Sequence, residues 1–140
     1  MTITTFEYMN KFAVQIMTVS SLFAGFSIAV IANLLISDIK TRLTNNILAI
    51  SILAANFFLV SVFAMTKVVI MTTEGNPNKA LIKDLSFPGT IGMSAFLLGT
   101  VSLLVVISMA GWTKSKKMGI FTTITGILSL ILIISMLKIF

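Results

Sequence analysis

The chain has 140 residues, of which 57% are apolar and only 10% are charged, and its mean hydropathy is +1.09. Soluble domains carry charges on about a quarter of their residues, so this chain is expected to lie in a membrane. The absence of Cys and His argues against an enzyme, a metal site or a cofactor. The net charge of +6 does not indicate nucleic-acid binding, because the ten basic residues are scattered among apolar runs and suit the flanks of membrane-spanning segments.

Four apolar runs are long enough to cross a bilayer, whose hydrocarbon core of about 30 Å requires roughly 20 helical residues. In chain order they cover residues 12–37, 47–71, 87–109 and 118–137. Asn45 and Asn46 precede the second run and are expected to cap its helix. A strand-built barrel would need alternating segments of about 10 residues instead. We therefore predict an all-α, multi-pass integral membrane protein.

Short links join these predicted helices, with about nine residues after the first, about 15 after the second and about eight after the third. Links of this length favour antiparallel neighbours, so residues 1–140 are predicted to form a single transmembrane domain, a four-helix up-and-down unit. The middle link and the first residues of the third predicted helix contain both prolines, and they are predicted to form a turn followed by a short amphipathic stretch.

The first predicted helix carries a stripe with polar ends and an apolar middle. At about 100° per residue, seven side chains fall within about 50° of one line along the helix. They are Gln15, Thr18, Leu22, Phe26, Ala29, Asn33 and Ser37. An amide that faces lipid tails leaves its donors and acceptors unpaired at a cost of several kcal/mol, so Asn33 is expected to face protein or water.

Two interpretations of this stripe stay open. In the first, Asn33 forms a hydrogen bond to a neighbouring helix, as membrane amides often do. In the second, the stripe lines a pore with a polar mouth at Asn33 and an apolar constriction at Leu22, Phe26 and Ala29 that gates by dewetting. The other helices favour packing, as shown by the small-xxx-small pair of Ala95 and Gly99 in the third.

The sequence SSLFAGFSIAVIAN at residues 20–33 resembles the first helix of the Orai calcium-channel family. That helix has a small-Leu-Leu-Ser-Gly-Phe run and a pore glutamate eight residues after the glycine. Gly25 and Phe26 match the Gly-Phe step, and Asn33 stands at the glutamate position. Short motifs in the other three helices are also similar to this family. They are Phe63-Ala64 in the second helix, Gly99-Thr100 followed by Leu104 and Trp112-x-Lys114 in the third, and Thr122-Thr123-Ile124 in the fourth.

The resemblance implies a symmetric homo-oligomer in the plasma membrane, a hexamer in this family, with the first helices around the ion path. It would place Asn33 in a ring at the outer mouth. A ring of amides offers oxygen dipoles but no net charge, so weak or altered selectivity is expected in place of calcium selectivity. Val106 replaces the family's glutamate in the third helix, and Ile127 replaces the proline that bends its fourth. Gly126 beside it, like Gly25 in the first helix, is a candidate hinge or packing position.

The predicted function is an oligomeric ion channel whose partners are further copies of the chain, the bilayer and the permeant ions. One alternative is a small non-transporting membrane protein, such as an accessory subunit, an immunity or lysis protein, or a defence effector. A four-helix coupled transporter is a further alternative, but it would need a carboxylate inside the membrane. The acidic residues all lie in predicted links or tails: Glu7, Asp38, Glu74 and Asp84.

Overall fold

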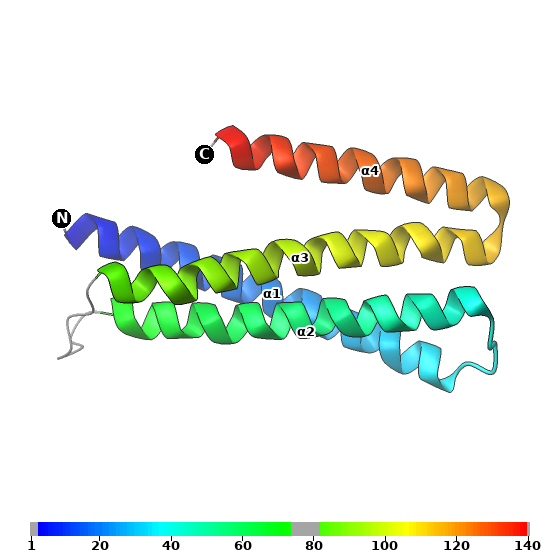
Figure 1. The fold of residues 1–140 in the computed structure, drawn as a ribbon, viewed down its shortest axis with the longest axis horizontal. Coiled ribbons are helices and arrows are strands. Elements are labelled where there is room, and N and C mark those ends of the chain that lie inside the picture. Colours follow the sequence, from blue (N-terminus) through cyan, green and yellow to red (C-terminus); the bar gives the residue numbers. More distant parts are fainter. Residues whose placement is uncertain (1–2, 74–81, 140) are drawn as a thin grey trace. The chain divides into compact units, whose positions relative to one another are not determined.

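A computed structural model describes residues 3–73 and 82–139, which form four long helices (Figure 1). In chain order these are α1 (Ile3–Ile36), α2 (Arg42–Thr72), α3 (Ile82–Lys114) and α4 (Lys116–Ile139). No strand occurs in the described ranges, so the predicted all-α class is confirmed. The predicted turn after the second helix lies mostly outside the described residues.

Each helix contains a segment that is long and apolar enough to cross a bilayer. These segments are Phe6–Ile36, Arg42–Thr72, Leu85–Lys114 and Lys116–Met136. The chain is therefore a multi-pass integral membrane protein. At 1.5 Å per residue the 34 residues of α1 extend for about 51 Å, so this helix is longer than the hydrocarbon core of about 30 Å.

The helices extend beyond their predicted ends, except that α1 ends at Ile36, one residue early, and the links between the helices are shorter than predicted. α1 begins at Ile3 instead of residue 12, and α3 and α4 are separated by Ser115 alone. The prediction followed apolar runs that lie between charged or polar residues. Charge raises the cost of burial in lipid, but Lys, Arg and Glu are good helix formers. An ion pair between Lys11 Nζ and Glu7 Oε1, at 2.7 Å and one turn apart, supports the additional turns of α1.

The start of α2 also differs from the prediction. The Thr44 backbone N–H donates to Thr41 Oγ1 at 3.1 Å, which makes Thr41 the N-cap. The prediction that Asn45 and Asn46 cap this helix was wrong, because both lie inside α2, beyond the hydroxyl that already satisfies its first turn.

The chain forms two compact units. Unit 1 contains Met1–Phe26 and Ala55–Gly99, and unit 2 contains Ser27–Ala54 and Thr100–Phe140. Each of the first three helices, α1, α2 and α3, is divided between the units, with one segment in unit 1 and the other in unit 2. The whole of α4 belongs to unit 2.

In unit 1, an aromatic cluster joins segments of all three contributing helices. Phe58 of α2 is 0% exposed, and its ring centroid lies 5.3 Å from that of Phe23 in α1 and 6.3 Å from that of Phe96 in α3. Gly99 allows the α3 backbone to approach this ring, since a Cβ atom there would lie 2.9 Å from Phe58 Cε1. The cluster fixes the spacing of the three helices in this unit.

Polar contacts also join α1 to α2 in unit 1. The buried hydroxyls of Ser20 and Ser61 are hydrogen-bonded at 3.1 Å. Asn10 Nδ2 donates to Thr72 Oγ1 at 2.9 Å and to the Val69 carbonyl at 3.2 Å. Because each of these polar groups has a partner, they can lie inside a membrane protein at little cost.

In unit 2, α3 and α4 form a closely packed hairpin. Trp112 Nε1 donates to Thr123 Oγ1 at 3.1 Å, and Thr122 Oγ1 donates to the Ser108 carbonyl at 3.0 Å. A Cβ atom at Gly119 would collide with the Trp112 ring. The Trp112 indole and the hydroxyls of Thr122 and Thr123 therefore join the two helices by hydrogen bonds.

Candidate pore-lining face of α1

α1 has one buried face, and small residues form it. Ala13, Ser20 and Ala24 are buried in unit 1, and Ser27 is buried in unit 2. At about 100° per residue these four positions fall within about 60° of one another around the helix. Small side chains allow neighbouring helices to approach closely, so this face packs inside the chain.

The predicted stripe lies on the other side of α1 in both units. In the unit 1 segment, its four members lie about 140–220° around the helix from Ala13, and all four are exposed. They are Gln15, Thr18, Leu22 and Phe26. In the unit 2 segment, Ala29 and Asn33 are also exposed, whereas Ser37 is half-buried and follows the last residue of α1.

The polar side chains of the stripe differ in whether they form hydrogen bonds within the chain. The Thr18 hydroxyl donates to the Val14 carbonyl at 2.8 Å, and Ser37 Oγ accepts a hydrogen bond from the Ile39 N–H at 3.3 Å. The Asn33 side chain has no hydrogen-bond partner in the part of the chain that the structure describes, although its backbone carbonyl bonds to Ser37 N at 3.2 Å. Within the described chain, the Asn33 amide is therefore open to water or to a second copy.

The apolar members of the stripe are large and uncovered. Leu22 is 68% exposed and Phe26 is 53% exposed. They lie one helical turn apart in the unit 1 segment of α1. Large apolar side chains that the chain itself leaves uncovered find their contacts outside it, in lipid, in another subunit or along the wall of a dewetted pore.

The four predicted hinge or packing positions have different surroundings. A Cβ atom at Gly25 would have no atom within 4 Å, so this glycine faces open space. Ala95 is buried, and Gly99 lies against Phe58. Gly126 lies against the Ser108 side chain, where a Cβ atom would collide with Oγ. Three of the four thus line contacts between helices, and the fourth does not.

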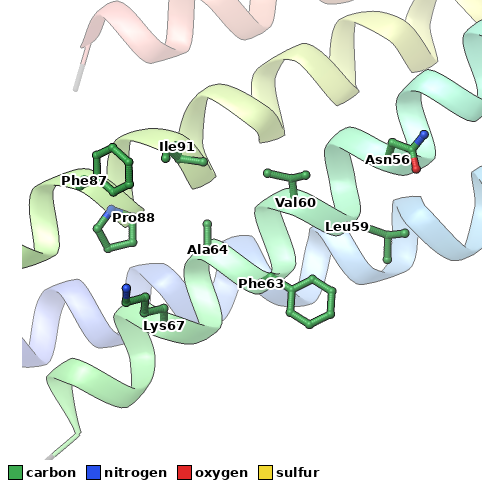
Figure 2. Close-up of a pocket in the computed structure, with 9 residues that line it drawn as sticks. All are labelled: Asn56, Leu59, Val60, Phe63, Ala64, Lys67, Phe87, Pro88 and Ile91. Atoms are coloured by element: carbon green, nitrogen blue, oxygen red, sulfur yellow. The ribbon is translucent and has the colours of Figure 1, made fainter.

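A groove between α2 and α3 in unit 1 was not predicted from the sequence. It has a volume of about 670 Å³, and Figure 2 shows its lining side chains. From α2 these are Asn56, Leu59, Val60, Phe63, Ala64 and Lys67, and from α3 they are Phe87, Pro88 and Ile91. The spacing of the α2 residues indicates one helix face, but nothing local to the sequence shows which part of α3 lies beside it.

Within the described ranges, no three His, Cys, Asp or Glu side chains gather at a place that could hold a metal ion. Buried polar groups are few, and one of them is unpaired: Ser51 Oγ in unit 2 has no hydrogen-bond partner among the described residues.

The chain matches no protein-family model, no curated protein and no solved structure. Its function is therefore inferred from the exposed face of α1 and the chemistry of that face.

Proposed function

We propose that this protein assembles through α1 into a homo-oligomeric ion-conducting pore of weak selectivity, as its resemblance to the Orai family suggests. One observation carries the proposal: the face of α1 that bears Leu22, Phe26 and Asn33 is exposed, while the opposite face packs inside the chain. In a ring of subunits, this arrangement directs the packed face outward to the other helices and the exposed face toward the axis.

The position of Asn33 favours water over lipid as its surroundings. It lies three residues before the end of α1, or about 4.5 Å along the helix axis. An amide exposed to hydrocarbon costs several kcal/mol, whereas at the mouth of an aqueous path water satisfies its donors and acceptors. Phe26 lies seven residues deeper, about 10.5 Å along the axis, where a ring of phenyl groups would form a dry constriction.

The uncharged character of the stripe supports weak selectivity. No stripe residue is acidic, and the chain has only four acidic residues against ten basic ones. Hard divalent cations prefer carboxylate oxygens, so an amide ring gives them little advantage over monovalent ions.

Ion flux into proteoliposomes tests the proposed constriction. We expect Phe26→Ser to hydrate it and raise monovalent flux about tenfold, the change that corresponds to a barrier lower by about 1.4 kcal/mol. Ala29→Ser should also increase monovalent flux. Ile28→Ser is the matched control, because Ile28 is exposed on the same helix but lies about 160° away from Phe26.

The same assay tests the proposed pore mouth with Asn33→Asp. This variant would place a ring of carboxylates at the mouth, so Ca²⁺ should bind there and block monovalent flux. Asn45→Asp near the start of α2 supplies the control, an exposed amide outside α1. If flux is unchanged in the Phe26, Ala29 and Asn33 variants while all three stay folded, the pore proposal is wrong. A stable monomer without ion flux would instead favour a non-transporting membrane protein.

A further inference from the structure

We propose that the groove between α2 and α3 binds an anionic phospholipid, with its phosphate at Lys67 and one acyl chain along the apolar section of the groove. This site is separate from the α1 face, and the inference does not depend on the proposed pore.

Lys67 supplies the positive charge at one end of the groove. It is exposed, lies in the spanning part of α2, and has no hydrogen bond or ion pair with another residue that the structure describes. It lies five residues before Thr72, where α2 ends, or about 7.5 Å along the axis. A lysine at this depth extends its amine toward the headgroup region, where lipid phosphates lie.

From Lys67 the groove continues along α2 into an apolar section. Figure 2 shows Lys67 beside Pro88 of α3 and Ala64 one turn deeper on α2, pointing toward α3. Ala64 contributes only a methyl group, while Phe63 and Phe87 are 74% and 72% exposed. An apolar lining of this kind suits an acyl chain.

The close approach of α3 to α2 beneath this section keeps the groove in place. A Cβ atom at Gly92 would lie 2.9 Å from Met65 Cε and 3.2 Å from Ala64 Cβ, so the two backbones are close there. Met65 is buried in the core of unit 1. The groove is therefore a preformed feature of the surface of this unit.

The apolar section has a defined length. Asn56 lines the deep end of the groove, eleven residues from Lys67, or about 16 Å along α2. A cation at the interface followed by an apolar channel matches a phospholipid better than it matches a free anion, which would use only the amine. The charge of Lys67 selects an anionic headgroup over a zwitterionic one.

Native mass spectrometry of the purified protein with dioleoyl phosphatidylglycerol or dioleoyl phosphatidylcholine tests the inference. We expect the anionic lipid to bind about fivefold more tightly, and Lys67→Gln to remove that preference. Lys67→Arg should keep it, because Arg retains the charge and binds phosphate well. Lys114→Gln, an exposed lysine at the end of α3 outside the groove, should also keep it.

The acyl chain is tested by Val60→Phe, which should fill the apolar section and weaken binding of both lipids. Thermal unfolding without lipid shows whether each variant is folded. A headgroup preference that survives Lys67→Gln would overturn the proposal. It would also be overturned if inorganic phosphate at equal concentration displaced the lipid, or if Val60→Phe left lipid binding unchanged.

Discussion

At the scale of single residues, Gly99 and Phe58 form a contact that leaves no room for an added atom. Phe58 is fully buried and has Phe23 and Phe96 as ring neighbours, so its ring cannot move aside when α3 presents a larger residue. The absence of a side chain at Gly99 therefore sets the distance between α2 and α3 in unit 1.

Gly99→Ala should destabilise the protein by about 1–3 kcal/mol, because the new methyl group would lie 2.9 Å from Phe58 Cε1. Gly89→Ala in the same helix is the control, since a Cβ atom there has no neighbour within 4 Å. It should leave stability unchanged or raise it by up to about 1 kcal/mol, the helix preference of Ala over Gly. Thermal unfolding in detergent measures both effects, and equal melting temperatures for the two variants would contradict this prediction.

At the scale of elements, the α3–α4 hairpin shows how a link of one residue is possible. The Met118 N–H donates to Ser115 Oγ at 3.2 Å, so the link residue itself caps α4. Gly111 and Gly119 lie where a Cβ atom would collide with Thr122 and Trp112 respectively. Without side chains at these two positions, α3 and α4 can lie close together directly after the turn.

The Trp112–Thr123 hydrogen bond across this hairpin can be observed directly, because the chain has a single Trp. Thr123→Val replaces the acceptor with a methyl group of similar size, so the fluorescence emission of Trp112 should shift to shorter wavelength. Thr125→Val is the control, because its hydroxyl bonds to the Phe121 carbonyl of its own helix at 2.7 Å. An identical emission maximum in both variants would show that the indole does not use Thr123.

At the scale of the whole molecule, the exposed face of α1 is where copies of the chain are proposed to meet. The natural sequence has no Cys, so each introduced cysteine reports on one position alone. Exposed positions on different sides of α1 then give opposite expectations for contact between copies.

Phe26→Cys and Leu22→Cys should form disulfide-linked dimers in membranes treated with a mild oxidant, because the proposed ring brings these positions from neighbouring copies together around one axis. Ile28→Cys, exposed on another side of α1, should not. Gel electrophoresis without reductant measures the outcome. Equal cross-linking at Ile28 and Phe26, or none at Leu22 and Phe26, would count against assembly through this face.

The sequence by itself determined the four spanning helices and the position of the α1 stripe, because hydropathy and the 100° helical period are properties of neighbouring residues. Only the tertiary structure decided which side of α1 is covered, since Ser20 is buried against Ser61, 41 positions later. The tertiary structure also decided where the groove at Lys67 lies, because its second wall comes from Phe87 and Pro88 on another helix. Such contacts depend on which helix faces meet, and the pattern within one helix does not contain that information.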